Sequence, residues 1–130
     1  MNHVPMRRSA AAVALLLSAA ACGGSHAPTS AGGVGVAVGP ASAQTFALHG
    51  NDRDQFIPQT VSAVVGVLTL TLQNGGVPHD LAFKDSALPG IGVVDGAATK
   101  STTLTFSRPG TYVFTCTIHP GMEGRVVVKG

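Results

Sequence analysis

Three side chains capable of binding a transition metal lie within seven residues of one another. The segment FTCTIHPGMEG, residues 114–124, contains Cys116, His119 and Met122. The chain has two cysteines and three methionines, and this segment holds every sulfur atom that follows Cys22. A thiolate, an imidazole and a thioether are ligands that late first-row transition metals accept readily. The segment is therefore a candidate metal-binding loop.

The spacing of these residues favours their convergence on one point. Cys116 is expected to end a strand, and a turn after it brings residues three apart to the same side, so that His119 and then Met122 approach Cys116. Pro120 restricts the backbone between the last two residues and Gly121 frees it, which suits a tight loop. A fourth ligand must come from elsewhere. The best candidate is His79 in NGGVPHDLAF, expected just before a strand.

The ligand types indicate which metal such a site would hold. Two imidazoles, a thiolate and a thioether are a poor set for calcium or magnesium, and the thioether argues against zinc. Two histidines, one cysteine and a weak axial methionine form the blue-copper set. Each residue also has a structural interpretation, with Cys116 and Met122 filling the core and the histidines in loops. The presence of all four together favours copper.

The N-terminal residues predict export. Residues 1–21 read as a signal peptide, with Arg7 and Arg8 before the apolar run AAAVALLLSAAA, which is too short to span a bilayer. Cys22, in AAAC followed by GGS, resembles the lipidated cysteine of a bacterial lipobox, although ordinary cleavage after Ala21 is an alternative. The protein is thus expected to be anchored by lipid at the extracytoplasmic face of the membrane, or to be secreted or periplasmic.

Residues 22–43 are rich in glycine, alanine, serine and proline, and we expect them to form a flexible tether. As a coil, this tether would reach about 25 Å from its anchor. Beyond it, six Lys and Arg balance six Asp and Glu. This balance offers no footprint for nucleic acid, so no nucleic-acid partner is expected and the membrane is contacted only through the lipid anchor.

Residues 44–130 show the period of two that is typical of strands buried on one face. In LTLTLQN, for example, Leu68, Leu70 and Leu72 alternate with polar residues. Such strands predict an all-β domain of two packed antiparallel sheets, a Greek-key sandwich of seven to eight strands. We expect strands near residues 45–48, 60–64, 67–74, 80–85, 102–107, 111–117 and 124–129.

The domain resembles the cupredoxins, and the loop CTIHPGMEGRVVVKG is most similar to the short ligand loop of amicyanin and plastocyanin-like proteins. FIPQTVSAVVG, NGGVPHD and PGTYVFTC extend the similarity over residues 44–130. The resemblance implies one type 1 copper ion that shuttles single electrons, with His79, Cys116 and His119 as equatorial ligands and Met122 as the axial ligand. It also implies that the edge of His119 reaches a surface patch, here Pro78, Ile118, Pro120 and Gly121, that docks redox proteins transiently.

Two positions depart from the family pattern. Asp80 stands where many members have an asparagine that ties the two ligand segments together, and its carboxylate can accept hydrogen bonds but cannot donate them. Ile118 stands where the amicyanin-like pattern has proline, and its backbone N–H could point at the Cys116 sulfur. His49, in HGNDRD, is more often solvated than a ligand.

Two other functions compete with electron carriage by a monomer. A copper delivery or buffering protein for an extracytoplasmic oxidase would also bind the ion, but such proteins favour open sites rich in methionine and histidine. A copper enzyme would need further copper ions, and the paired histidines that hold them are missing from the sequence. The sequence therefore favours a carrier and not an enzyme.

Overall fold

The structure is a computed structural model and describes residues 32–130. The predicted signal peptide, residues 1–21, and the predicted lipidation site, Cys22, lie outside the described residues. Within residues 32–130, no helix is long and apolar enough to cross a membrane.

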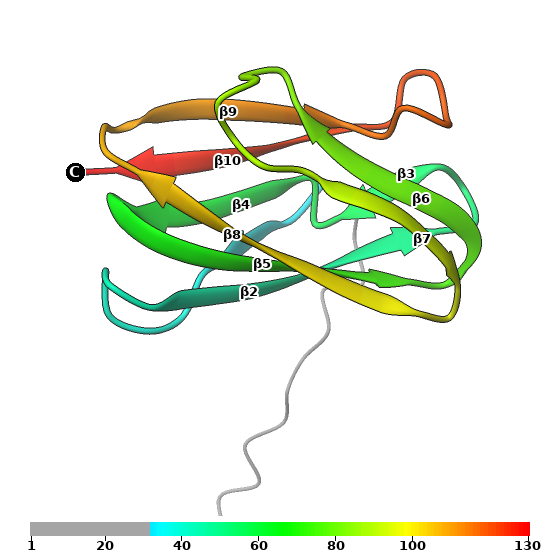
Figure 1. The fold of residues 1–130 in the computed structure, drawn as a ribbon, viewed down its shortest axis with the longest axis horizontal. Helices are drawn as coiled ribbons and strands as arrows, with labels where there is room; N and C mark the ends of the chain where they lie inside the picture. The colour runs from blue at the N-terminus through cyan, green and yellow to red at the C-terminus, as the bar shows by residue number, and fades with distance from the viewer. Residues whose placement is uncertain (1–31) are drawn as a thin grey trace, which may run out of the picture.

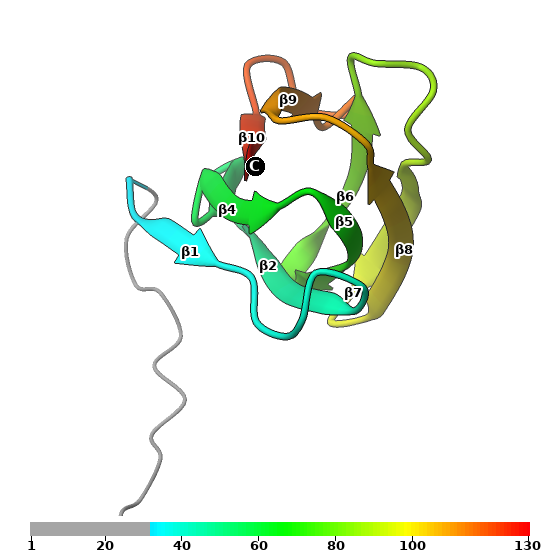
Figure 2. The ribbon, with the colours of Figure 1, turned by 90° about the vertical axis from the view of Figure 1, so that its left-hand side faces the viewer.

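The described residues form two sheets packed face to face (Figures 1 and 2). The six-stranded sheet has the order β1-β4-β10-β9-β6-β7, and the four-stranded sheet has the order β3-β2-β5-β8. The ten strands are β1 (Val34–Val36), β2 (Gln44–Asn51), β3 (Gln55–Ile57), β4 (Thr60–Val64), β5 (Gly66–Asn74), β6 (Gly76–Phe83), β7 (Ile91–Gly96), β8 (Thr99–Phe106), β9 (Gly110–Thr115) and β10 (Glu123–Lys129).

The predicted alternation positions the core. Leu68, Leu70 and Leu72 of β5 are fully buried between the sheets. Side chains from both sheets complete this core: Leu48, Phe56, Val61, Leu81, Leu104, Phe106, Phe114 and Val126. Because successive side chains on a strand point to opposite faces, one apolar face per strand is enough to build a two-layer domain. The predicted all-β sandwich is confirmed.

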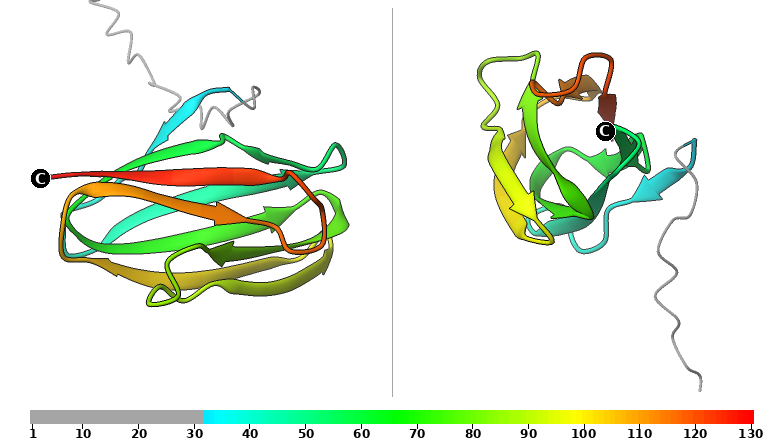
Figure 3. Two further views of the ribbon diagram at one scale, coloured as in Figure 1. Left: turned by 90° about the horizontal axis from the view of Figure 1, so that it is seen from above. Right: turned by 90° about the vertical axis from the view of Figure 1, so that its right-hand side faces the viewer.

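The sheets are mixed rather than antiparallel, so this part of the prediction is wrong. β2 pairs with β5, β4 with β10, and β1 with β4 in parallel. β10 also pairs antiparallel with β9 and thus lies between strands from distant parts of the chain (Figure 3). Periodicity reports which face of a strand is buried but carries no information on the direction of its neighbour. Consecutive strands such as β4 and β5, or β8 and β9, lie in different sheets, and connections of this kind occur in Greek-key sandwiches.

Several predicted boundaries also need correction. β3 and β7 were not predicted because they are short or lack a regular alternation, and the described residues contain ten strands instead of seven or eight. β6 begins at Gly76 rather than near residue 80, so His79 lies inside a strand. β2 continues to Asn51, so His49 lies in a strand and does not begin a loop.

The tether predicted over residues 22–43 is wrong for its last part. Val34–Val36 form β1, which pairs with Thr60–Ser62 of β4, and Val38 makes a bridge with Thr45. Gly35 faces inward, where a Cβ would stand 2.1 Å from the Phe46 ring. In VGVAV, residues 34–38, glycine and alanine alternate with valine, so the face that carries Gly35 and Ala37 can pack closely against the domain. Composition alone concealed that pattern.

Candidate metal centre

The predicted ligands come from β6 and from the loop that joins β9 to β10. The pairing of Thr115 with Glu123 closes this loop at its base. Inside it, the Cys116 N–H donates to the Met122 carbonyl at 3.0 Å, and the Met122 N–H donates to the His119 carbonyl at 3.2 Å. The loop lies at the end of the molecule opposite the C-terminus (Figure 1). Its backbone is therefore held by its own hydrogen bonds and by the sheet.

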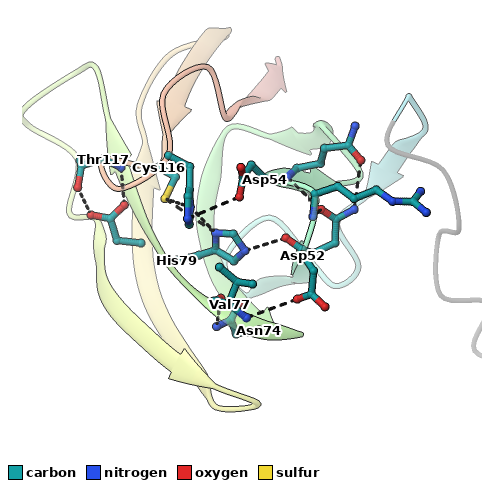
Figure 4. Close-up of polar contacts among 12 residues, drawn as sticks. Asp52, Asp54, Asn74, Val77, His79, Cys116 and Thr117 are labelled. Carbon is teal, nitrogen blue, oxygen red and sulfur yellow. Dashed lines mark hydrogen bonds and ion pairs between the residues drawn. The ribbon is translucent and has the colours of Figure 1, made fainter.

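Three donor atoms converge where β6 faces this loop (Figure 4). Nδ1 of His79 is 3.1 Å from Nδ1 of His119, and the Cys116 Sγ lies 3.5 Å from the His119 Nδ1 and 4.0 Å from the His79 Nδ1. Candidate ligand atoms of these residues all lie within 4.8 Å of one another. His79 and Cys116 are buried, and Cys116 is a free thiol. Residues 40 positions apart in sequence thus form one cluster.

These separations fit a first-row transition metal. Bonds of about 2.0–2.3 Å to nitrogen and sulfur place neighbouring donor atoms about 3.3–3.8 Å apart in tetrahedral or trigonal geometry. The three observed separations, 3.1, 3.5 and 4.0 Å, bracket that range. Met122 lies in the same loop and is 2% exposed, so its thioether is shielded from water. The residues present therefore fit one copper ion.

The orientation of His79 is fixed from the side opposite the cluster. Its Nε2–H donates to the backbone carbonyl of Asn51 at 2.9 Å. A carbonyl can only accept, so the proton stays on Nε2 and the lone pair of Nδ1 is directed at the cluster. Such an outer hydrogen bond holds a ligating imidazole in one tautomer and one orientation. Neither Asn51 nor its role was predicted, because backbone carbonyls leave no signal in the sequence.

His119 is the more exposed imidazole, and its outer edge faces a carboxylate. Its side chain is 18% exposed, and its Nε2 lies 3.5 Å from Oδ1 of Asp54. Asp54 belongs to the turn between β2 and β3 and has a φ of 55°, in the left-handed region. This contact was missed by sequence reasoning. Nothing in the sequence HGNDRD indicates that Asp54 contacts His119, which lies 65 positions later in the chain.

Asp80 links the two ligand segments despite its departure from the family pattern. It accepts hydrogen bonds from the Thr117 N–H at 2.6 Å and from the Thr117 hydroxyl. Burial alone would raise the pKa of Asp80, but these hydrogen bonds outweigh it and lower the pKa from its ordinary value. The expected loss of a donor is therefore offset, because Thr117 supplies both donors. β6 and the metal-binding loop remain tied together.

The remaining predicted residues have mixed outcomes. Ile118 is 42% exposed, and Pro78, Pro120 and Gly121 are also exposed. No hydrogen bond within the described residues joins the Ile118 N–H to the Cys116 sulfur, which instead lies near the Nδ1 atoms of the two imidazoles. His49 does not belong to the cluster. It faces away because its neighbours Leu48 and Gly50 are the inward-facing residues of β2.

The fold and these contacts define an all-β domain with a single candidate centre for a soft metal within residues 32–130. A family model for copper binding proteins of the plastocyanin/azurin family matches residues 44–129. The chain therefore belongs to the plastocyanin/azurin family of copper-binding proteins, and copper is its cofactor. The resemblance inferred from the Cys-x-x-His-x-x-Met loop is confirmed.

Individual relatives agree with this assignment. Chloroplastic plastocyanin of Physcomitrium patens is 33% identical over 103 residues, covering 71% of this chain and 61% of that protein. Amicyanin-alpha of Methylorubrum extorquens is 40% identical over 57 residues, covering 41% and 46%. The chain thus spans less than two thirds of either relative. Auracyanin A of Chloroflexus aurantiacus, a blue copper protein, shares the fold with a TM-score of 0.57 at 18% identity, covering 68% of this chain and all of that one.

Proposed function

We propose that His79, Cys116, His119 and Met122 hold one copper ion and that the protein carries single electrons between redox proteins. The observation that carries this proposal is the convergence of two Nδ1 atoms and one Sγ atom, which lie 3.1–4.0 Å from one another. Copper, when bound, supplies the Cu(II)/Cu(I) couple. The protein supplies two oriented imidazoles, one thiolate shielded from water and one buried thioether.

The surroundings of the site suit a carrier more than a catalyst. The ligand frame is fixed by the Asn51 carbonyl, by the loop hydrogen bonds and by the Asp80–Thr117 contacts. A frame of this kind resists movement of the ligands when the charge of the ion changes, so electron transfer needs little reorganisation. Within residues 32–130, no second cluster of metal ligands accompanies this one. The fixed ligand frame therefore supports a role as an electron carrier.

The test uses the full chain loaded with copper. We expect an intense visible absorption band from thiolate-to-Cu(II) charge transfer, a narrow hyperfine splitting in the paramagnetic resonance spectrum, and reversible bleaching on reduction. Cys116→Ser should abolish the band. Cys22→Ser is the matched control, because it removes the other cysteine and should leave the band intact. A colourless protein that takes up Cu(I) alone and passes it to a chelator would instead support copper delivery.

Met122 and the exposed residues extend the proposal. We propose Met122 as the weak axial ligand, so Met122→Leu should retain the blue band and raise the reduction potential, since a donor that stabilises Cu(II) is lost. Pro78, Ile118, Pro120 and Gly121 would provide an apolar patch for brief contacts between a monomer and its redox partners. Ile118→Lys should then slow electron transfer to a partner without altering the optical spectrum.

The cellular location is a separate part of the proposal. We propose that residues 1–21 direct export and that Cys22 carries lipid, which holds the domain at the extracytoplasmic face of a membrane. The sequence AAAC followed by GGS supports this assignment. Metabolic labelling with a fatty acid tests it. Cys22→Ala should lose the label and release the protein from membranes, whereas a secreted or periplasmic protein would carry no label in either form.

A further inference from the structure

We propose that Asp54 is a positioning residue for the copper site, which fixes the imidazole of His119 and lowers the reduction potential. The inference rests on the proposed function and concerns this chain's own ligand frame. His119 follows Cys116 in an exposed loop, and its ring is less enclosed than that of His79. A contact on its outer edge therefore has more influence on its orientation than a contact on a fully buried ring would.

The geometry places the carboxylate where it can act on the ligand. Oδ1 of Asp54 is 3.5 Å from Nε2 of His119, while Nδ1 of the same ring faces Cys116 and His79. Figure 4 shows Asp54 directed at the cluster from the β2–β3 turn. Among the ion pairs of residues 32–130, Asp54 has no lysine or arginine partner. The Asp54 carboxylate therefore faces the imidazole, and no lysine or arginine of residues 32–130 forms an ion pair that would neutralise its charge.

The turn that carries Asp54 is built to hold it there. The side-chain oxygen of Asn51 accepts hydrogen bonds from the N–H groups of Arg53 and Gln55, both at 3.0 Å. The Asn51 side-chain amide donates to the Gln55 side chain at 3.1 Å. Asp54 itself adopts a left-handed backbone conformation, which aspartate and asparagine tolerate better than most residues. The turn is thus ordered by contacts that do not use the Asp54 carboxylate.

The end of β2 and the turn that follows it therefore contact both imidazoles from outside. The Asn51 carbonyl accepts from Nε2 of His79, and the Asp54 carboxylate faces Nε2 of His119. A carboxylate beside the outer nitrogen of a ligating histidine increases the electron density on the inner nitrogen. It also adds a negative charge near the ion. Both effects stabilise Cu(II) more than Cu(I), so the reduction potential falls.

Asp54→Asn tests the proposal, with Asp52→Asn as the control. Both variants remove one negative charge from the same turn, and asparagine keeps the backbone preference of position 54. Asp52 lies apart from His119, since its Oδ1 accepts from the Val77 N–H at 3.4 Å, and asparagine can retain that contact. We expect Asp54→Asn to increase the ratio of Cu(I) to Cu(II) at a fixed applied potential by on the order of threefold. The effect is small because the charge acts on the ion through strongly screening surroundings. Asp52→Asn should have a smaller effect.

A second measurement does not need copper. In the full-length metal-free protein, the ¹⁵N signals of the His119 ring should move in Asp54→Asn and stay in place in Asp52→Asn. Equal reduction potentials in the two variants would overturn the proposal. So would His119 ring signals that stay in place in Asp54→Asn. If the parent protein forms no copper–thiolate band, the proposed function fails, and the imidazole signals still decide whether Asp54 acts on His119.

Discussion

Gly50 lies against the imidazole of His79, so closely that a Cβ at position 50 would stand 2.5 Å from the His79 Cδ2. Gly50 is an inward-facing residue of β2, in the four-stranded sheet, whereas His79 belongs to β6 in the other sheet. The missing side chain at position 50 therefore provides the space that the ring occupies. His79 is therefore positioned by the packing of the two sheets as well as by its own strand.

Gly50→Ala should therefore disturb the metal centre. The added methyl group must move the His79 ring or separate the sheets, which we expect to cost about 1–3 kcal/mol of unfolding free energy and to weaken copper binding. Chemical denaturation and copper titration measure the two effects. Gly92→Ala is the matched control, because its Cβ would meet no atom within 4 Å. Equal behaviour of the two variants would contradict the packing role of Gly50.

Asp80→Ala should lower stability at neutral pH. It removes the acceptor of two hydrogen bonds from Thr117, a loss of about 1–3 kcal/mol. Because the pKa of Asp80 is lowered in the folded protein, its stabilising contribution is complete above its unfolded pKa and disappears as the pH falls through the folded value. The difference in unfolding free energy between the parent and the variant should thus shrink below about pH 4.

Asp95→Ala serves as the control for Asp80. Its carboxylate makes no recorded side-chain hydrogen bond within the described residues, and Asp95 is exposed. We expect a change in unfolding free energy within about 0.5 kcal/mol at neutral pH. If Asp80→Ala lost the same unfolding free energy at every pH down to 2, packing of the side chain, and not its charged hydrogen bonds, would explain the loss.

Phe114→Ala should cause one of the largest losses in the domain. The ring is fully buried, makes edge-to-face contacts with Phe56 at 5.0 Å and with Phe83 at 5.6 Å, and packs against Gly124. We expect a loss of about 3–5 kcal/mol in denaturant titrations, because a cavity would form between the sheets. Thr111→Ala, at an exposed position of the same strand, should have little effect.

Gly35→Val tests whether β1 belongs to the domain. Its side chain would collide with the Phe46 ring and with Pro58, whose Cγ would lie 2.9 Å from the new Cβ. We expect the melting temperature to fall, with a loss of about 1–3 kcal/mol. Gly32→Val is the control, because nothing lies within 4 Å of a Cβ there. Indistinguishable melting curves would restore the interpretation of residues 34–36 as a tether.

The sequence indicated which side chains cluster better than it indicated the contacts that hold them in place. Cys116, His119 and Met122 could be proposed as candidates because a short loop fixes their spacing, and His79 because it was expected just before a strand, after a Gly-Gly turn. The contacts of Asn51, Asp54 and Gly50 could not, because each joins segments that are distant in sequence and depends on how the two sheets meet. One of these contacts uses a backbone carbonyl and another uses a missing side chain.

The fold shows the same division between local and long-range information. The alternation in β5 predicted which side chains are buried, since that pattern is a property of a single strand. The parallel pairing of β10 with β4 depends on where a distant strand returns, and no local pattern encodes it. β1 was missed because glycine and alanine face inward there, where a hydrophobic side chain is usually expected.

The placement of β10 has a consequence for the newly synthesised chain. This strand is the last of the domain, yet it lies between β4 and β9 and closes the loop that carries Cys116, His119 and Met122. During translation, the six-stranded sheet stays split until residue 129 has left the ribosome. The nascent polypeptide therefore has Cys116 and both histidines before β10 pairs with β9, and the loop is closed at its base only when this last strand is in place.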